Sequence, residues 1–248
     1  MGIVVGLTGV GGGSLMAPIM MLIFGIAPAT AVGTDLWFAA ITKTFGAWVH
    51  GRKGTIDWQV LRRLAYGSIP ASMLTLYWLH TSGATKGSGA WMTKALGAML
   101  IASSVAALSR ARAHALGEHL RETQPVPFKA TQPVLTVLAG AVVGCLVTLT
   151  SIGAGALGAI MLLYLYPRRL TPSSLVGTDI SHAIPLTLLA GTGHALLGNV
   201  NVELLLNLLL GSIPGIVIGS LAAVRAPANL IRTAIAIVLA AVGVKMLV

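Results

Sequence analysis

The sequence carries very little charge for its length. Of its 248 residues only 9% are charged, with 6 Asp and Glu against 16 Lys and Arg, whereas 56% are hydrophobic. The mean hydropathy is +0.89. Ordinary soluble domains carry about 25% charged residues. The shortage of charge therefore excludes an ordinary soluble domain and predicts a protein embedded in a membrane.

Cysteine is almost absent, because Cys145 is the only one. A single cysteine excludes an internal disulfide and a cysteine metal cluster, and the expected role is that of a small buried residue. No paired histidine spacing suggests a metal site. The sequence also lacks a cofactor motif and a recognisable set of nucleophile, base and orienting group. We therefore expect no metal, no cofactor and no enzymatic activity.

The sequence also lacks a basic patch interleaved with aromatic residues, although its net charge is +10. Such a patch is typical of nucleic-acid-binding proteins. Here Lys and Arg lie almost wholly between apolar runs, as in the cytoplasmic loops of membrane proteins. The expected partner is therefore the lipid bilayer and not nucleic acid. Because no basic residue precedes the first apolar stretch, we expect a first membrane helix there and not a cleavable signal peptide.

Apolar runs close to the roughly 20 residues that cross a bilayer recur along the chain. They lie at residues 1–25, 30–50, 58–80, 90–109, 134–166, 173–197, 202–224 and 229–248. Residues 110–133 form the only long polar interval, rich in basic residues and proline. We therefore predict an all-α polytopic membrane protein with a first transmembrane repeat at 1–109, a basic linker at 110–133 and a second repeat at 134–248.

The two halves of the chain repeat one another. Val32-Gly33-Thr34-Asp35 recurs at one separation, 144 residues (from 33 to 177), and so do several other motifs. The matching positions are Val176 to Asp179 for Val32 to Asp35, His194 for His50, Asn201 for Asp57, and Gly211 to Pro214 for Gly67 to Pro70. An internal duplication of this kind is typical of transporters built from two repeats.

Each half also contains a glycine-rich stretch inside an apolar run, Thr8 to Ser14 and Thr150 to Ala156. Glycine costs a helix about 1 kcal/mol relative to alanine, so these stretches predict helix breaks. Broken backbone at membrane depth survives only where it is buried in protein or lines a cavity. A short helix restarting after each break would direct its N-terminal amides toward an anion. Tight helix packing through small residues is the alternative interpretation.

The charge distribution favours inverted repeats. If each broken segment doubles back at its glycines, each repeat has an odd number of passes and the second repeat is upside down. Nearly all basic residues then share one face, leaving Lys86, Lys94 and Lys245 on the other. If the broken segment crosses once, the bias is weak. We therefore predict inverted repeats, each with a glycine-broken helix hairpin, and expect the loops at 25–28 and 167–170 on opposite sides of the membrane.

Ionisable residues inside the predicted helices are candidates for coupling. An ionised carboxylate in a bilayer costs at least about 2.5 to 3.5 kcal/mol. Asp35 and Asp179 therefore either stabilise the N-terminal ends of their helices, as caps or first-turn acids, or exchange protons or cations beside the substrate path.

His50 and His194 end equivalent helices, where an imidazole is favoured by the helix dipole; proton relay is the alternative. Lys43, two turns along the same helix from Asp35, is a possible ion partner or a positive charge facing an anion, but Thr187 replaces it in the second half, so it lies outside the symmetric core.

Asp57 and Asn201 occupy equivalent loop positions just before predicted helices. Both side chains are of the kind that accepts hydrogen bonds from the first amides of a helix. We therefore expect both to cap the helices that follow.

These motifs resemble the sulfite exporter TauE/SafE family. The resemblance rests on Gly11-Gly12-Gly13 followed by Pro18, on Ala31 to Thr34, and on Gly54 to Trp58, and it extends over nearly the whole chain. It implies a multi-pass inner-membrane protein that moves sulfite, sulfoacetate or related anions. It also implies a pathway lined around Gly11, Gly12, Gly13 and Thr34, with the counterparts Gly153, Gly155 and Thr178. Family members commonly have a small hydroxyl or amide residue where this chain has Asp35 and Asp179, a departure that fits proton-coupled movement or a different solute.

We therefore expect a transporter of a small anion, with sulfite or an organosulfonate as the favoured substrate, working by alternating access. The hydroxyls of Ser14 and Ser151 join the substrate-binding candidates, and the coupling candidates are Asp35, Asp179, His50 and His194. An ion channel, or a membrane scaffold that binds a soluble partner through residues 110–133, stays open. A homodimer also stays open, because Gly211, Gly215 and Gly219 could pack on a second chain or on the neighbouring repeat.

Overall fold

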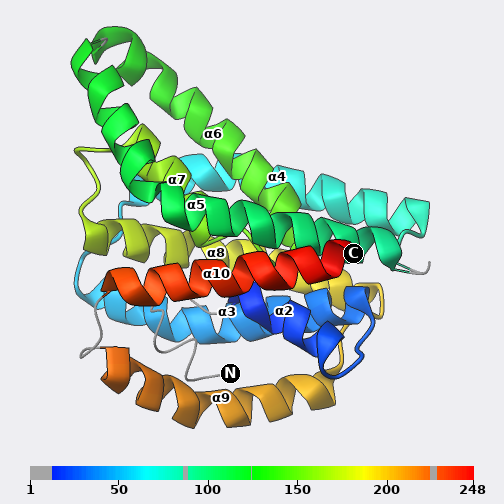
Figure 1. Cartoon of the computed structure of the whole chain (residues 1–248). Helices are drawn as coiled ribbons and strands as arrows, with labels where there is room; N and C mark the ends of the chain where they lie inside the picture. The colour runs from blue at the N-terminus through cyan, green and yellow to red at the C-terminus, as the bar shows by residue number, and fades with distance from the viewer. Residues whose placement is uncertain (1–12, 86–88, 124, 224–227) are drawn as a thin grey trace.

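The computed structural model describes residues 13–85, 89–123, 125–223 and 228–248 (Figure 1). Within these ranges the chain forms helices and no strand. The helices are α2 (Gly13–Leu22), α3 (Pro28–Arg52), α4 (Trp58–Ser82), α5 (Ala90–Thr123), α6 (Pro125–Thr150), α7 (Ala156–Leu165), α8 (Pro172–Leu196), α9 (Val202–Ala223) and α10 (Ala228–Leu247). The all-α prediction is confirmed for this part of the chain.

Several helices are long enough to cross a bilayer. α3, α4 and α8 contain 25 residues each, which corresponds to about 37 Å at 1.5 Å per residue and exceeds the roughly 30 Å hydrocarbon core. By length and apolar composition together, α5 and the Val126–Thr150 part of α6 qualify as membrane-crossing helices.

The basic segment 110–133 is helical wherever the structure describes it. It forms the end of α5 and the start of α6, and these two ends project from one end of the bundle (Figure 1). The linker between the predicted repeats therefore lengthens two helices. The proposed repeat boundaries stay a prediction.

The internal duplication is reproduced in the helix boundaries. α3 and α8 begin at Pro28 and Pro172, and α4 and α9 begin at Trp58 and Val202, so both pairs keep the separation found between the motifs. α2 and α7 are 10 residues long and follow the two glycine-rich stretches. Corresponding segments of the sequence thus fold into corresponding helices.

α3 and α8 pack antiparallel to each other, and equivalent hydrogen bonds form at the two ends of the pair. At one end, the backbone N–H of Asn201 donates to Oγ1 of Thr34 at 3.1 Å. At the other end, the backbone N–H of Asp57 donates to Oγ1 of Thr178 at 2.9 Å. In the duplication, Thr34 is equivalent to Thr178 and Asp57 is equivalent to Asn201. The same contact with exchanged partners is what a local two-fold relation produces.

The two helices approach closely at a pair of equivalent glycines, Gly33 and Gly177. A Cβ on Gly33 would overlap the carbonyl oxygen of Asn199, and one on Gly177 would lie 2.8 Å from Oγ1 of Thr55 and 3.0 Å from Nδ1 of His50. Neither position leaves room for a side chain. Glycine at these positions is therefore required by the packing of α3 on α8.

We expect Gly33→Ala to destabilise the protein by about 1 to 3 kcal/mol, the usual cost of forcing extra atoms into a packed interior. Gly46→Ala on the same helix is the matched control, because its Cβ would lie 3.6 Å from Cγ2 of Ile180, an ordinary contact. Thermal unfolding of the detergent-purified proteins measures the effect. Equal unfolding temperatures for Gly33→Ala and the unaltered protein would contradict this account of the α3–α8 contact.

Two other helix pairs have defined directions. Gly97 of α5 and Gly243 of α10 face each other, since a Cβ on either would lie 2.8 Å from the carbonyl oxygen of the other. Further along, the Ser104 hydroxyl donates to the Ala236 carbonyl at 2.7 Å, so α5 and α10 run antiparallel. α4 and α6 run parallel: Gly140 packs on the backbone of Leu64, Gly144 on that of Ser68, and the hydroxyls of Ser72 and Thr148 are 2.7 Å apart.

The second glycine-rich stretch interrupts the helix. α6 ends at Thr150 and α7 begins at Ala156, and between them φ is 57° at Ser151, 124° at Gly153 and 146° at Gly155. Positive φ suits glycine and opposes a continuous helix. The first glycine-rich stretch, apart from Gly13 and Ser14 at the start of α2, lies outside the described residues.

Beyond this break the chain turns back along α6. The side-chain amide of Gln132, early in α6, donates to the carbonyl of Leu165 at the end of α7 at 2.6 Å. The hydroxyls of Thr136 and Tyr166 are 2.7 Å apart. The end of α7 therefore lies beside the start of α6, and the break lies at the far end of the pair.

Candidate functional site

The break between α6 and α7 brings charged side chains from other helices together. The ammonium of Lys43 on α3 donates to the carbonyl of Ala154 at 3.4 Å. Asp179 on α8 lies against Gly158 in the first turn of α7, where a Cβ would be 2.6 Å from its Oδ1. A cation from the first half of the chain and a carboxylate from the second half therefore meet at the restart of α7.

A small pocket opens beside this break. Its lining includes Gly155, Asp179 and, from α5, Arg110. Asp179 interacts electrostatically with both Lys43 and Arg110. The site thus combines two cations with a carboxylate around a segment of non-helical backbone.

The start of α7 has no side-chain cap, because its N-cap residue is Gly155. The first amides of a helix have no carbonyl partners within the helix and carry the positive end of its dipole. The backbone N–H of Gly158 donates a hydrogen bond to the carbonyl of Gly153 at 3.1 Å. The positive end of a helix dipole favours negative charge, and the carboxylate of Asp179 lies against this end of α7.

Asp35 on α3 is completely buried. The Ser151 hydroxyl at the break lies near enough to interact with the carboxylate of Asp35, although among the described residues neither side chain makes a hydrogen bond of full geometry. Lys43 lies within electrostatic reach of Asp35 as well as Asp179. Buried polar groups are almost always hydrogen-bonded, and an ionisable group in a membrane helix indicates a functional site.

The predicted substrate-binding residues fall into three groups. Ser151, Gly153 and Gly155 form the break itself. Thr34 and Thr178 are buried and their hydroxyls accept backbone hydrogen bonds from the opposite half of the chain. Gly13 and Ser14 begin α2, whereas Gly11 and Gly12 lie outside the described residues.

The two predicted histidines end their helices in different surroundings. His50 is half-buried, with Nδ1 2.8 Å from the hydroxyl of Thr55. His194 is fully buried and its Nε2 lies 2.9 Å from the carbonyl of Thr148, two residues before α6 ends. Because a carbonyl only accepts, Nε2 of His194 carries a proton. Its Nδ1 has no partner within the described part of the chain.

The structure adds His182, which the sequence analysis did not single out. It lies on α8 one turn after Asp179, is buried, and has its Nε2 2.8 Å from the hydroxyl of Ser68. It is also within electrostatic reach of Lys43. Phe38 occupies the equivalent position in the first half, so the duplication gave no signal there. A histidine inside an apolar run was the only available indication.

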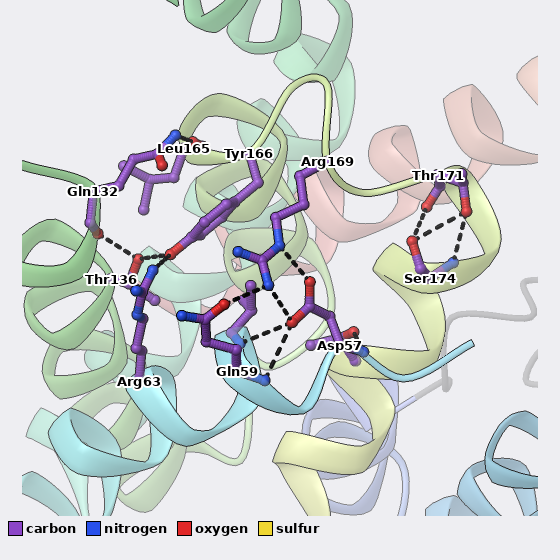
Figure 2. Close-up of polar contacts among 12 residues, drawn as sticks. Asp57, Gln59, Arg63, Gln132, Thr136, Leu165, Tyr166, Arg169, Thr171 and Ser174 are labelled. Carbon is purple, nitrogen blue, oxygen red and sulfur yellow. Dashed lines mark hydrogen bonds and ion pairs between the residues drawn. The ribbon is translucent and has the colours of Figure 1, made fainter. Parts of the chain in front are cut away.

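Asp57, at the start of α4, combines a cap with an ion pair (Figure 2). Its carboxylate accepts from the amides of Gln59 and Val60 at 3.2 and 3.1 Å and from Arg169 at 2.6 and 3.0 Å. Partial burial raises the pKa of Asp57, but the hydrogen bonds and the charge of Arg169 outweigh it and hold the pKa below its ordinary value.

Asn201 has the corresponding role at the start of α9, where its side-chain oxygen accepts from the amide of Leu204 at 2.9 Å. The capping predicted for both Asp57 and Asn201 is therefore confirmed. Each of these caps directly adjoins the backbone N–H that bonds Thr178 or Thr34.

Comparison with known proteins identifies the family. The model of the family Sulfite exporter TauE/SafE matches residues 1–246. The probable membrane transporter protein YjnA of Bacillus subtilis (strain 168) is 43% identical over 222 residues, which cover 88% of this chain and 85% of that protein. The probable membrane transporter protein YdhB of the same organism is 27% identical over 257 positions, covering 100% of this chain and 96% of that protein. No solved structure matches. The match extends over almost the entire chain, so the resemblance is confirmed and the protein belongs to the sulfite exporter TauE/SafE family.

Proposed function

We propose that the protein is a multi-pass transporter of the cell inner membrane that moves a small anion, sulfite or an organosulfonate, through the broken region between α6 and α7. The observation that carries the proposal is the position of Lys43, whose ammonium contacts the carbonyl of Ala154 beside the uncapped start of α7. The family and the names of its relatives in Bacillus subtilis support transport.

Charge balance supports coupling to protons. With Lys43 and Arg110 protonated and Asp35 and Asp179 ionised, the fixed side-chain charges of the site cancel. An entering monovalent anion would leave one uncompensated negative charge in the apolar interior, which is energetically costly. Uptake of one proton by either carboxylate restores neutrality. Anion and proton would therefore bind together and be released together.

Alternating access follows from inverted repeats, which we propose for the two halves. The antiparallel packing of α3 on α8 and of α5 on α10 supports this, because each pair joins corresponding helices. In such proteins the two repeats exchange conformations around a central site and so open it to each side in turn. The counterpart of the α6–α7 break would be the stretch that precedes α2.

Cysteine accessibility tests the inverted arrangement. In a Cys145→Ala background, Ala27→Cys marks the exposed loop before α3, and Ser173→Cys marks the exposed start of α8. In intact cells, a membrane-impermeant maleimide should label one of these cysteines, and the other should react only after permeabilisation. Labelling of both in intact cells, or of both only after permeabilisation, would contradict the inverted repeats.

Counterflow distinguishes a transporter from a channel. Proteoliposomes preloaded with unlabelled sulfite should transiently accumulate labelled sulfite above its external concentration, because a carrier exchanges bound substrate across the membrane. A channel cannot produce this overshoot. Entry that only equilibrates, without saturation, would assign the protein to the channel class.

A further inference from the structure

A second pocket lies at the end of the bundle from which α5 and α6 project, and its volume is about 350 Å³. This volume is within the range of small-molecule sites. The pocket shares no lining residue with the small pocket at Asp179. Five cationic side chains line it: Arg63, Arg121, Lys129, Arg168 and Arg169.

The inner wall of this pocket is held in place by hydrogen bonds (Figure 2). The buried hydroxyl of Tyr166 accepts from Arg63 at 3.1 Å and contacts the Thr136 hydroxyl at 2.7 Å. Gln132 is also buried and is fixed to the carbonyl of Leu165. Arg63 is therefore held by a neutral partner, and within the described residues no carboxylate pairs with its positive charge.

The charges of the pocket do not balance. Of its five cationic side chains, Arg169 is paired with Asp57 and Arg168 with Glu122. Arg63, Arg121 and Lys129 form no ion pair with a carboxylate in the described part of the chain. An excess of three positive charges therefore surrounds the pocket. Arginine is well suited to phosphate because its guanidinium matches two phosphate oxygens at once.

The surroundings of the pocket suit a group at the membrane surface. Its cations come from the start of α4, the end of α5, the start of α6 and the loop before α8, all on the basic face that the positive-inside rule assigns to the cytoplasm. Along α6, the pocket is followed by exposed apolar side chains, Val134, Leu135, Leu138 and Val142. Basic pockets between membrane helices on this side bind anionic lipid headgroups.

We propose that this pocket binds a phosphate-bearing anion, supplied either by the headgroup of an anionic lipid or by a soluble phosphate. The three unpaired cations provide the charge, and the exposed apolar face of α6 accommodates acyl chains when the phosphate belongs to a lipid. The bound group would join α4, α5, α6 and the α7–α8 loop at one point. It would therefore stabilise the folded protein independently of the transport site.

Ligand-dependent thermal stability tests the proposal on the full chain purified in detergent. The probes are phosphatidylglycerol in mixed micelles and inorganic phosphate, with phosphatidylcholine and sulfate as their respective controls. A saturating ligand should raise the unfolding temperature by about 5 °C. A shift with phosphatidylglycerol alone identifies a lipid headgroup, and a shift with phosphate as well identifies a site open to soluble anions. No shift with either would overturn the proposal.

Paired variants separate this site from general electrostatic attraction. Arg121→Gln with Lys129→Gln removes two pocket charges that form no ion pair in the described structure. Lys53→Gln with Arg112→Gln removes two exposed basic charges outside the pocket lining. We expect the first pair to weaken the apparent affinity for phosphatidylglycerol at least about tenfold and the second to leave it unchanged. Equal weakening by both pairs would overturn the proposal.

Discussion

Replacing Lys43 by glutamine is expected to lower the initial rate of sulfite uptake at sub-saturating concentration by about 150-fold. Two unit charges about 5 Å apart attract by about 3 kcal/mol at an effective dielectric constant of about 20. Glutamine keeps a donor for the carbonyl of Ala154 but removes the charge. The loss should therefore appear mainly in the apparent affinity for the anion. Initial rates in proteoliposomes over a range of sulfite concentrations measure it.

Two further variants control for this result. Lys43→Arg keeps the charge and should retain much of the affinity. Lys53→Gln removes an equal charge from an exposed position beyond the end of α3 and should transport at the unaltered rate. Unchanged uptake by Lys43→Gln, with the protein correctly folded, would show that the cation at the break does not bind substrate.

The double variant Asp35→Asn, Asp179→Asn is expected to abolish the response of transport to a pH gradient. Both carboxylates lie inside the bundle and within electrostatic reach of Lys43. If they exchange the coupled proton, their removal should bring the ratio of rates with and without the gradient to about 1. Residual anion movement down its own gradient can persist. Uptake at several internal and external pH values measures the ratio.

Asp57→Asn is the matched control for the carboxylate variants. It also replaces a carboxylate by an amide, but at a helix cap outside the membrane-spanning interior, where an amide still accepts from the amides of Gln59 and Val60. Its transport should keep the full response to the gradient. A double variant that responds to the gradient like the unaltered protein would remove Asp35 and Asp179 from the coupling mechanism.

The duplication made much of the helix arrangement accessible from the sequence. The motifs repeated at one separation lie in helices that begin at the same separation, α3 with α8 and α4 with α9. The glycine-rich stretch before Ala156 anticipated the end of one helix and the start of another. These features depend on the energetic cost of glycine in a helix and on its freedom to adopt a positive φ. Short segments of sequence are enough to encode both.

The partners of individual polar residues were not accessible in the same way. Thr34 and Thr178 were predicted to line the substrate path, but the sequence did not reveal that their hydroxyl oxygens accept backbone hydrogen bonds from the other half. Lys43 could be named from the sequence as an ion partner of Asp35 or a charge facing an anion, but its contact with the break of the second half could not be predicted. A comparison of equivalent positions detects only what both halves share, and Lys43 acts across the two halves without a counterpart.

The basic pocket also could not be predicted from the sequence. Its cations are distributed over four segments of the chain, and each alone is explained by the preference of cytoplasmic loops for Lys and Arg. Only the packing of α4 and α6 with the loop before α8 brings Arg63, Lys129 and Arg169 around one cavity. The positive-inside rule therefore explains how many cations lie on this side of the membrane, but it does not explain why they surround one cavity.

Uptake of labelled sulfite into proteoliposomes, with and without an imposed pH gradient, tests whether the protein is a proton-coupled anion transporter. We predict saturable uptake above that of empty liposomes, with a rate that changes when the gradient is imposed. Protein that is folded and inserted but takes up no sulfite above the empty liposomes would contradict the assignment of sulfite as substrate. Saturable uptake that ignores the gradient would contradict the proton-coupled mechanism.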